Sequence, residues 1–300
     1  MARKRKILIF GGSGFIGYHL AKFALTKNFQ VTSISKKLPK KKRKLNNVKY
    51  IFINAAKEEL SKKIKENFDY VINASGYGEH HGFNKKGYDL FYNNYISLVN
   101  IVEYFKNKKI KKFIHFGTSF EYGYSQKKIK ENFPNIPTSI YGMSKLACTN
   151  YLKEIFQQSN FPFTIFRLFQ VYGDQQDKNR LIPFVINNCI RNKIFFVSSG
   201  NQVRNFCHID DIVEAVFLSF SNKKTNGEIF NIGSDENFKV KKIVKIINKK
   251  IGSGKPIFGR KKLHLGENNK IIPDIQKIKK ILKWKSKFTF KNTLNNMIKK

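Results

Sequence analysis

The stretch Gly11-Gly12-Ser13-Gly14-Phe15-Ile16-Gly17 decides the fold of this 300-residue chain. It follows directly on the apolar run Ile7–Phe10, which predicts a strand, and it opens the amphipathic stretch 15–27, which predicts a helix. Glycines at these spacings let a backbone turn tightly, approach a pyrophosphate and pack a helix against a strand. The N–H groups and positive dipole of the helix N-terminus attract phosphates. The stretch therefore predicts the first turn of a dinucleotide-binding fold.

Short apolar runs alternate with amphipathic stretches on either side of this turn. Nearly unbroken apolar strands suit a parallel sheet that is buried on both faces. We therefore predict an α/β fold with a Rossmann-type, doubly wound parallel sheet. The expected strands are 7–10, 31–34, 48–53, 70–74, 113–116 and 163–168, and the expected helices between them are 15–27, 57–67, 89–107 and 141–158.

The alternation loosens after residue 168. Further helices are expected at 181–191, 211–220, 240–251 and 275–282, separated by loops rich in Gly, Pro and Asn. This pattern indicates a smaller C-terminal α/β substrate lobe. We place the nucleotide-binding domain at 1–170 and the substrate lobe at 171–300, with segments of the lobe returning to the first domain.

The net charge of +38 suggests nucleic acid as a partner, but the composition favours another explanation. Only 8 of the 58 basic residues are Arg, and Lys, Asn and Ile share AT-rich codons. The one dense block, 36–44, has no interleaved aromatic residues for base stacking. We therefore expect a solvated basic surface and no dedicated nucleic-acid partner.

Other features of the composition bear on cell location. A hydrophobic fraction of 41% excludes a disordered chain. The sequence contains no run of about 18 apolar residues, so we expect no membrane-spanning helix. The apolar run after the basic N-terminus ends after four residues, so we expect no signal peptide and a cytoplasmic location. Cys148, Cys189 and Cys207 form no CxxC pair, which excludes a Cys-based zinc site. The adjacent His80 and His81 lack acidic partners, so no metal site is expected.

The end of the second expected strand bears on cofactor choice. Dinucleotide sites usually carry an acidic residue about 20 positions after the glycines, where it binds the ribose hydroxyls. Here Ser35 occupies that place, and Lys36 and Lys37 follow it. A hydroxyl and two ammonium groups would accept a 2′-phosphate, which favours NADP over NAD. The alternative is that both lysines only continue the general lysine excess.

Tyr141-Gly142-Met143-Ser144-Lys145 carries the chemistry. A spacing of four on a helix places Tyr141 and Lys145 side by side. A phenol titrates near pH 10, but a neighbouring ammonium favours the phenolate and lowers its pKa toward neutral pH. The pair therefore predicts an acid/base group beside a dinucleotide.

With both motifs in order, the chain resembles the extended short-chain dehydrogenase/reductase family, in the branch that handles nucleotide sugars. The resemblance runs nearly end to end, to Asp274-Ile275 and the segment 282–285. Its motifs are Ala74-Ser75-Gly76, Asn94, the segment 116–123, the segment Arg167–Gly173 and the segment Arg204–Asp211.

The resemblance implies an NAD(P)-dependent epimerase or 4-ketoreductase, in which hydride transfer at the sugar C4 uses Tyr141 as acid/base. It implies a nucleotide-diphosphate sugar as substrate, held in part by Arg204, and a homodimer built on helices 89–107 and 141–158. The expected catalytic residues are Thr118, Tyr141 and Lys145. The expected cofactor-binding residues are Gly11, Gly14, Phe15, Ile16, Gly17, Ser35, Lys36, Lys37, Asn54, Ala55, Ala74, Ser75, Gly76, Asn94, Tyr141 and Lys145, and the expected substrate-binding residues are Tyr77, Thr118, Ser119, Gln170 and Arg204.

The chain also departs from the family pattern. Ser119-Phe120 stands where the 4,6-dehydratases carry an Asp-Glu pair, so we expect no dehydration. Glu121 is displaced by one position and should point elsewhere, and Gln170 replaces an Asn that contacts substrate. The alternative function is a non-catalytic, NADP-sensing regulator or nucleic-acid-binding protein on the same fold. The intact Thr118, Tyr141 and Lys145 argue against it, because a sensor has no use for a tuned phenol.

Overall fold

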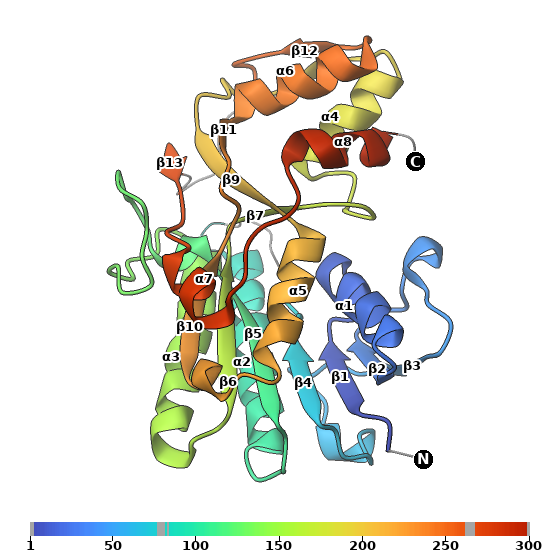
Figure 1. Ribbon diagram of the computed structural model, residues 1–300, viewed down its shortest axis with the longest axis vertical. Coiled ribbons are helices and arrows are strands. Elements are labelled where there is room, and N and C mark those ends of the chain that lie inside the picture. Colours follow the sequence, from blue (N-terminus) through green and yellow to red (C-terminus); the bar gives the residue numbers. More distant parts are fainter. Residues whose placement is uncertain (1–2, 77–81, 83, 262–267, 299–300) are drawn as a thin grey trace.

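A parallel sheet of seven strands forms the centre of the protein (Figure 1). The computed structural model describes residues 3–76, 82, 84–261 and 268–298. The strand order is β10-β6-β5-β4-β1-β2-β3, so the chain reverses direction across the sheet between β1 and β4. The predicted Rossmann-type fold is therefore confirmed. The strands are β1 (Lys6–Phe10), β2 (Gln30–Ser35), β3 (Val48–Phe52), β4 (Tyr70–Asn73), β5 (Lys112–Thr118), β6 (Phe163–Leu168) and β10 (Glu228–Ile232).

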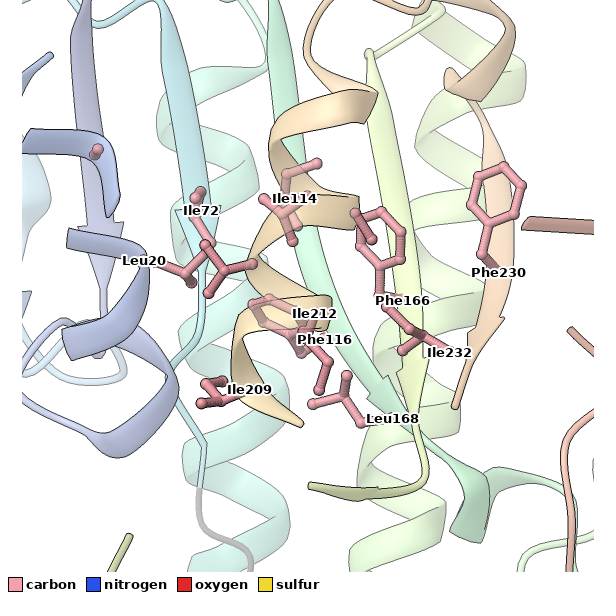
Figure 2. Packing of buried hydrophobic residues seen from close by; sticks show 14 of the residues in the cluster. Leu20, Ile72, Ile114, Phe116, Phe166, Leu168, Ile209, Ile212, Phe230 and Ile232 are labelled. Carbon is pink, nitrogen blue, oxygen red and sulfur yellow. The ribbon is translucent and has the colours of Figure 1, made fainter. Parts of the chain in front are cut away.

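Helices cover both faces of this sheet. Helices α2 (Lys85–Phe105) and α3 (Ile140–Ser159) bury Leu98 and Leu152 on one face. The other face carries α1 (Phe15–Thr26), α5 (Ile209–Ser219) and α7 (Gln276–Leu282). Figure 2 shows Ile212 of α5 beside Phe116 of β5, and Ile209 belongs to the same buried cluster. Each fully buried side chain of this size contributes about 1.5–3 kcal/mol to folding. Packing on both faces therefore fixes the positions of the strands and of their carboxyl ends.

A smaller lobe lies at the carboxyl ends of the sheet strands (Figure 1). Its second sheet joins β7 (Gln170–Tyr172), β9 (Val203–His208), β11 (Asn237–Lys239) and β13 (Lys270–Ile271). A separate cluster of buried residues, which includes Val185, Ile243 and Phe290, forms its core. The remaining elements of the lobe are α4 (Leu181–Ile190), β8 (Ile194–Phe196), α6 (Val240–Ile251), β12 (Lys255–Ile257) and α8 (Phe290–Ile298).

The helix expected at 57–67 is wrong. Leu60, Ile64 and Phe68 are buried, as their helical spacing suggests, but only a single 3₁₀ turn forms, at Leu60–Lys62. Isolated helices this short are marginal, and tertiary contacts hold this segment instead. The Ile64 carbonyl accepts a hydrogen bond of 2.6 Å from the Tyr104 hydroxyl, and the Lys63 ammonium donates to the Phe52 carbonyl at 2.7 Å.

Several short strands after residue 168 were not expected from the sequence. The most consequential is β10, which pairs in parallel with β6 and so joins the central sheet from the distal half of the chain. Helix α2 begins at Lys85, four residues before the predicted start, because the Asn84 side chain caps it by accepting from the Gly87 N–H. Among the described residues, no helix is long and apolar enough to cross a membrane.

Candidate active site

A cavity of about 540 Å³ lies between the carboxyl ends of the sheet strands and the smaller lobe. Its size is in the range of small-molecule sites, and its place is where doubly wound sheets bind ligands. The cavity brings together segments that are far apart in the sequence. The predicted site residues that line it are Gly14, Phe15, Ile16, Ala74, Ser75, Gly76, Thr118, Tyr141, Lys145, Gln170 and Arg204.

The glycine turn after β1 is fixed by its backbone. Gly11 has a φ of +77°, and a Cβ there would lie 2.6 Å from the Ala74 carbonyl oxygen. A Cβ on Gly17 would overlap the Gly11 carbonyl, so α1 packs as closely as glycine allows. Helix α1 begins after Gly14 with no side-chain cap and no acidic residue in its first turn. This bare N-terminus beside the cavity fits the pyrophosphate of a dinucleotide.

The residues proposed to select the cofactor lie behind this turn and outside the cavity lining. The Ser35 hydroxyl accepts a hydrogen bond of 3.1 Å from the Ser13 N–H and donates to the Ile34 carbonyl. The Lys36 ammonium donates to the Asn93 side chain at 2.5 Å, and Lys37 is exposed. Ser35 therefore contacts the glycine turn directly, and Lys36 and Lys37 follow it in the chain.

Asn54 and Ala55 follow β3 and also lie outside the cavity lining. The Asn54 side chain accepts from the Ala56 N–H at 3.2 Å. The carbonyl of buried Ala55 accepts from the Asn100 side chain at 2.9 Å. Both residues thus take part in local contacts that shape the loop after β3.

The three expected catalytic residues come from two elements. Thr118 ends β5, while Tyr141 and Lys145 lie on the first turns of α3. The Lys145 side chain is almost fully buried and donates to the Phe116 carbonyl at 3.0 Å. Phe120 packs its ring edge against Tyr141, with 6.0 Å between the ring centres. All three residues line the cavity together.

Asn94 supports this group from α2. Its amide donates to the Ser144 hydroxyl at 3.1 Å, and that hydroxyl donates to the Tyr141 carbonyl at 2.8 Å. A Cβ placed on Gly76 would lie 3.1 Å from the Lys145 Nζ. The turn after β4 and the start of α3 are therefore in close contact around Lys145.

His115 of β5 is a buried neighbour of Lys145 that the sequence analysis missed. Burial, together with the positive charge of Lys145, holds the pKa of His115 well below its usual range, so the ring is neutral. Its Nδ1 lies 3.3 Å from the Asn73 amide nitrogen, and Asn73 in turn accepts from the Ser75 N–H at 3.1 Å. No sequence signal marks this group, because a lone His in an apolar run is more often a satisfied core residue.

Glu121 points away from the cavity, as its displaced position suggested. It is fully buried beside Arg167, which is also fully buried, and Ser119 is buried as well. Tyr122 lies beneath Arg167, and burial raises the pKa of its phenol to about 12. Neither Glu121 nor Tyr122 therefore stands where it could serve as acid or base for a bound ligand.

The lobe supplies cations to the cavity. Gln170 is half-buried at the start of β7, and Arg204 on β9 is 3% exposed and donates to the Val203 carbonyl at 2.9 Å. Arg180 and Lys261 also line the cavity, and the sequence analysis did not single them out. The general lysine excess hid Lys261, and Arg180 could have been found from its place just before the helix expected at 181–191. Three cations that line the cavity from the lobe suit a diphosphate.

Part of the basic block 36–44 is used inside the molecule. Arg43 is 3% exposed and donates to the Gln175 carbonyl at 3.0 Å and to the Asp177 carboxylate at 3.1 Å. Lys40 pairs with Asp177 at 2.7 Å. These contacts tie the loop after β2 to the lobe. Tyr77, His80 and His81, which were considered for substrate or metal contact, lie outside the described residues.

Comparison with known proteins identifies the family. The model of the NAD dependent epimerase/dehydratase family matches residues 7–233. The chain belongs to this family. A dTDP-D-glucose 4,6-dehydratase of Dictyostelium discoideum is 33% identical over 77% of the chain, and the match spans 58% of that protein.

Two further relatives cover nearly the whole chain. An uncharacterized UDP-glucose epimerase of Bacillus subtilis is 29% identical over 98% of this chain and 96% of its own length. The UDP-glucuronic acid 4-epimerase of Bacillus cereus, solved with UDP-glucuronic acid and NAD, is 26% identical with a TM-score of 0.90. That alignment covers 98% of both chains. The relatives are thus nucleotide-sugar enzymes of more than one class, which supports an enzyme without deciding the reaction.

Proposed function

We propose that this protein is an NAD(P)-dependent nucleotide-sugar epimerase or 4-ketoreductase that transfers hydride at C4 of the sugar, with Tyr141 as the acid/base. The observation that carries the proposal is the shared cavity. Thr118, Tyr141 and Lys145 line it together with the glycine turn on one side and Arg204 on the other. A cofactor and a diphosphate sugar bound there would meet beside Tyr141.

Each catalytic side chain has a separate role in this proposal. The nicotinamide, when bound, supplies the hydride acceptor and donor. Tyr141 exchanges a proton with the C4 oxygen, and the Thr118 hydroxyl hydrogen-bonds that oxygen. The ammonium of buried Lys145, one helical turn from Tyr141, holds the nicotinamide ribose. The neutral ring of His115 leaves Lys145 as the nearby positive charge.

The residues after Thr118 argue against dehydration. Elimination of water needs an acid–base pair beside the sugar, and this chain offers buried Ser119 and the apolar ring of Phe120. Glu121, the nearest carboxylate in the sequence, is occupied by Arg167 in the interior. Hydride therefore passes once, in a reductase, or out and back, in an epimerase.

Arg180, Arg204 and Lys261 support a diphosphate-linked substrate, because guanidinium and ammonium groups recognise phosphate oxygens. The Bacillus cereus relative binds a UDP-sugar, which makes UDP-sugars the first substrates to test. Among cofactors we propose a preference for NADP, supported by Ser35 in place of the acidic residue and by Lys36 and Lys37 beside it. The same relative binds NAD, so both cofactors belong in the assay.

We also propose a homodimer that pairs α2 and α3 with their copies in a second chain. Tyr88 is 66% exposed and Met143 is 41% exposed on these helices, and Tyr95 packs edge-on against Tyr151 beside them. Val102 and Phe105, by contrast, are fully buried against the sheet and contribute nothing to such an interface. Light scattering at micromolar concentration should give the mass of two chains, and a strictly monomeric mass would remove this proposal.

Turnover tests the proposed function directly. The purified protein is incubated with NAD or NADP and with UDP- and dTDP-sugars, including their 4-keto forms, and the products are separated by mass spectrometry and NMR. We expect inversion at C4 or reduction of the 4-keto group. The non-catalytic alternative predicts cofactor binding with every sugar returned unchanged, and formation of a 4-keto-6-deoxy sugar would overturn the argument against dehydration.

A further inference from the structure

We infer that Glu121 is a positioning residue for the catalytic group, and that it holds Thr118 and the start of α3 in register through its buried carboxylate. This inference rests on the proposed function and deepens it. Glu121 does not line the cavity, so it is not a catalytic residue. Its contacts reach β5, which carries Thr118, α3, which carries Tyr141, and Arg167 of β6.

Both oxygens of the Glu121 carboxylate accept hydrogen bonds from groups at the site's margin. Oε1 accepts from the Thr118 N–H at 2.8 Å. Oε2 accepts from the Thr149 hydroxyl at 2.7 Å and from the Arg167 Nε at 2.9 Å, and Arg167 Nη2 lies 2.7 Å away. Glu121 and Arg167 are both fully buried, so water does not compete for these contacts.

The sequence around Glu121 makes room for this arrangement. Gly117 lies directly before Thr118, and a Cβ on it would overlap Glu121 Oε1. Gly142, directly after Tyr141, packs on the Phe120 carbonyl, which a Cβ would also overlap. The 3₁₀ turn Ser119–Glu121 is therefore in contact with the end of β5 on one side and with the start of α3 on the other. A shift of Glu121 would therefore displace the end of β5 and the start of α3.

Only a carboxylate satisfies this set of donors. Every group that faces the two oxygens donates an N–H or O–H to them, and of these groups only the Thr149 hydroxyl could rotate to accept instead. An amide in the same place has one oxygen. If the amide oxygen of Gln faces Arg167, the NH₂ group faces the Thr118 N–H. If the amide oxygen faces Thr118, the NH₂ group faces Arg167. One side of the junction must therefore open in Glu121→Gln, although size and shape are kept.

The test compares Glu121→Gln with a matched control, Asp211→Asn. Asp211 is also fully buried and its carboxylate accepts two backbone hydrogen bonds, from Lys287 at 2.8 Å and Phe288 at 3.3 Å, so it holds the segment 287–288 to the first turn of α5. Both variants are assayed well below their melting temperatures. We expect Glu121→Gln to lower kcat at least about tenfold, with cofactor Kd and sugar KM within about threefold, because small misplacement of reacting groups costs rate more than affinity. Asp211→Asn should keep kcat within about twofold.

Two readouts separate positioning from a general loss of structure. The transferred hydride is labelled with deuterium, at C4 of the sugar for an epimerase or on the reduced nicotinamide for a 4-ketoreductase. The isotope effect on kcat should rise in Glu121→Gln and stay unchanged in Asp211→Asn, because hydride transfer becomes slower than product release. Amide exchange measured by NMR should be faster at Thr118 in Glu121→Gln alone. Unchanged kcat, or kcat and exchange that change equally in both variants, would overturn the inference. If the wild-type protein turns over no nucleotide sugar, the proposed function fails, and the Thr118 exchange rate still decides whether Glu121 holds this turn.

Discussion

The turn after β1 and the turn after β5 both bring backbone to the cavity, but they are held in place by different means. Gly11–Gly17 is held by main-chain contacts, in which the Gly11 N–H donates to the Ile34 carbonyl at 2.7 Å and the Gly14 N–H to the Gly11 carbonyl at 2.9 Å. The turn at Thr118 is held by the buried Glu121 carboxylate and its donors. The first turn therefore depends on the absence of side chains, and the second depends on one charged side chain.

The largest expected effect is on kcat, when the proposed acid/base beside the turn at Thr118 is removed. Tyr141→Phe removes the proton path and keeps the ring that packs on Phe120, so cofactor binding should stay within a few-fold. General acid–base groups contribute about 10²–10⁴ in rate, and kcat should fall by that factor. Steady-state kinetics and a cofactor titration measure both quantities. A near-normal kcat with any substrate would show that the phenol is not the acid/base.

The next largest effect is on cofactor affinity, when a substitution disturbs the glycine turn after β1. In Gly11→Ala the new methyl group meets the Ala74 carbonyl at a φ of +77°, so the turn must shift. Overpacking of this kind costs about 1–3 kcal/mol. If the free protein relieves this strain by shifting the turn and the cofactor-bound protein cannot, cofactor affinity falls by about five- to 150-fold. Gly252→Ala is the matched control, because its φ is +81° and nothing lies within 4 Å of the new Cβ. Equal cofactor affinity in the two variants would contradict the close-packing argument.

A third prediction concerns Asp211, a buried carboxylate that forms no ion pair with the residues that the structure describes. Burial raises the pKa of Asp211 to about 6, above its ordinary value of 3.8, despite two backbone donors. Because the folded-state pKa is the higher one, protonation stabilises the fold, and this stability is lost as pH rises from about 4 through 6. Up to about 3 kcal/mol is at stake, at 1.36 kcal/mol per pKa unit. Urea unfolding across pH 4–7 should show the free energy of the wild-type protein falling relative to Asp211→Asn. A constant difference would mean that the carboxyl titrates normally.

The smallest effect concerns cofactor choice behind the first turn. If Ser35, Lys36 and Lys37 bind a 2′-phosphate, NADPH should bind more tightly than NADH. Exposed charges of this kind are worth roughly 0.5–2 kcal/mol together, which is roughly a two- to thirtyfold preference. The preference should shrink at high salt, because exposed charges are screened over about 8–10 Å. Ser35→Asp should reverse it, as measured by fluorescence titration. Equal affinities in the wild-type protein would assign the two lysines to the general basic surface.

The same contrast explains what could be predicted from the sequence. The glycine turn and the pair Tyr141 and Lys145 are local patterns, so their elements were found, and the Rossmann-type fold is confirmed. The junction at Glu121 was not found, since its partners Thr149 and Arg167 lie 28 and 46 residues away. Strand β10 was missed for a related reason, because only its pairing with β6 makes a five-residue run a strand. The helix expected at 57–67 was wrong, and in that segment the Ile64 carbonyl accepts from the distant Tyr104 hydroxyl, a contact that no local pattern reveals.

The most direct test of the central claim follows the hydride. The protein is loaded with NADPH or NADH that carries deuterium at the transferable position of the nicotinamide, and is mixed with a nucleotide 4-ketosugar. NMR and mass spectrometry then locate the label in the product. Our account predicts deuterium bonded to C4 of the sugar, at a rate that Tyr141→Phe lowers by about 10²–10⁴. A ketosugar returned unchanged, or a product without deuterium at C4, would contradict it.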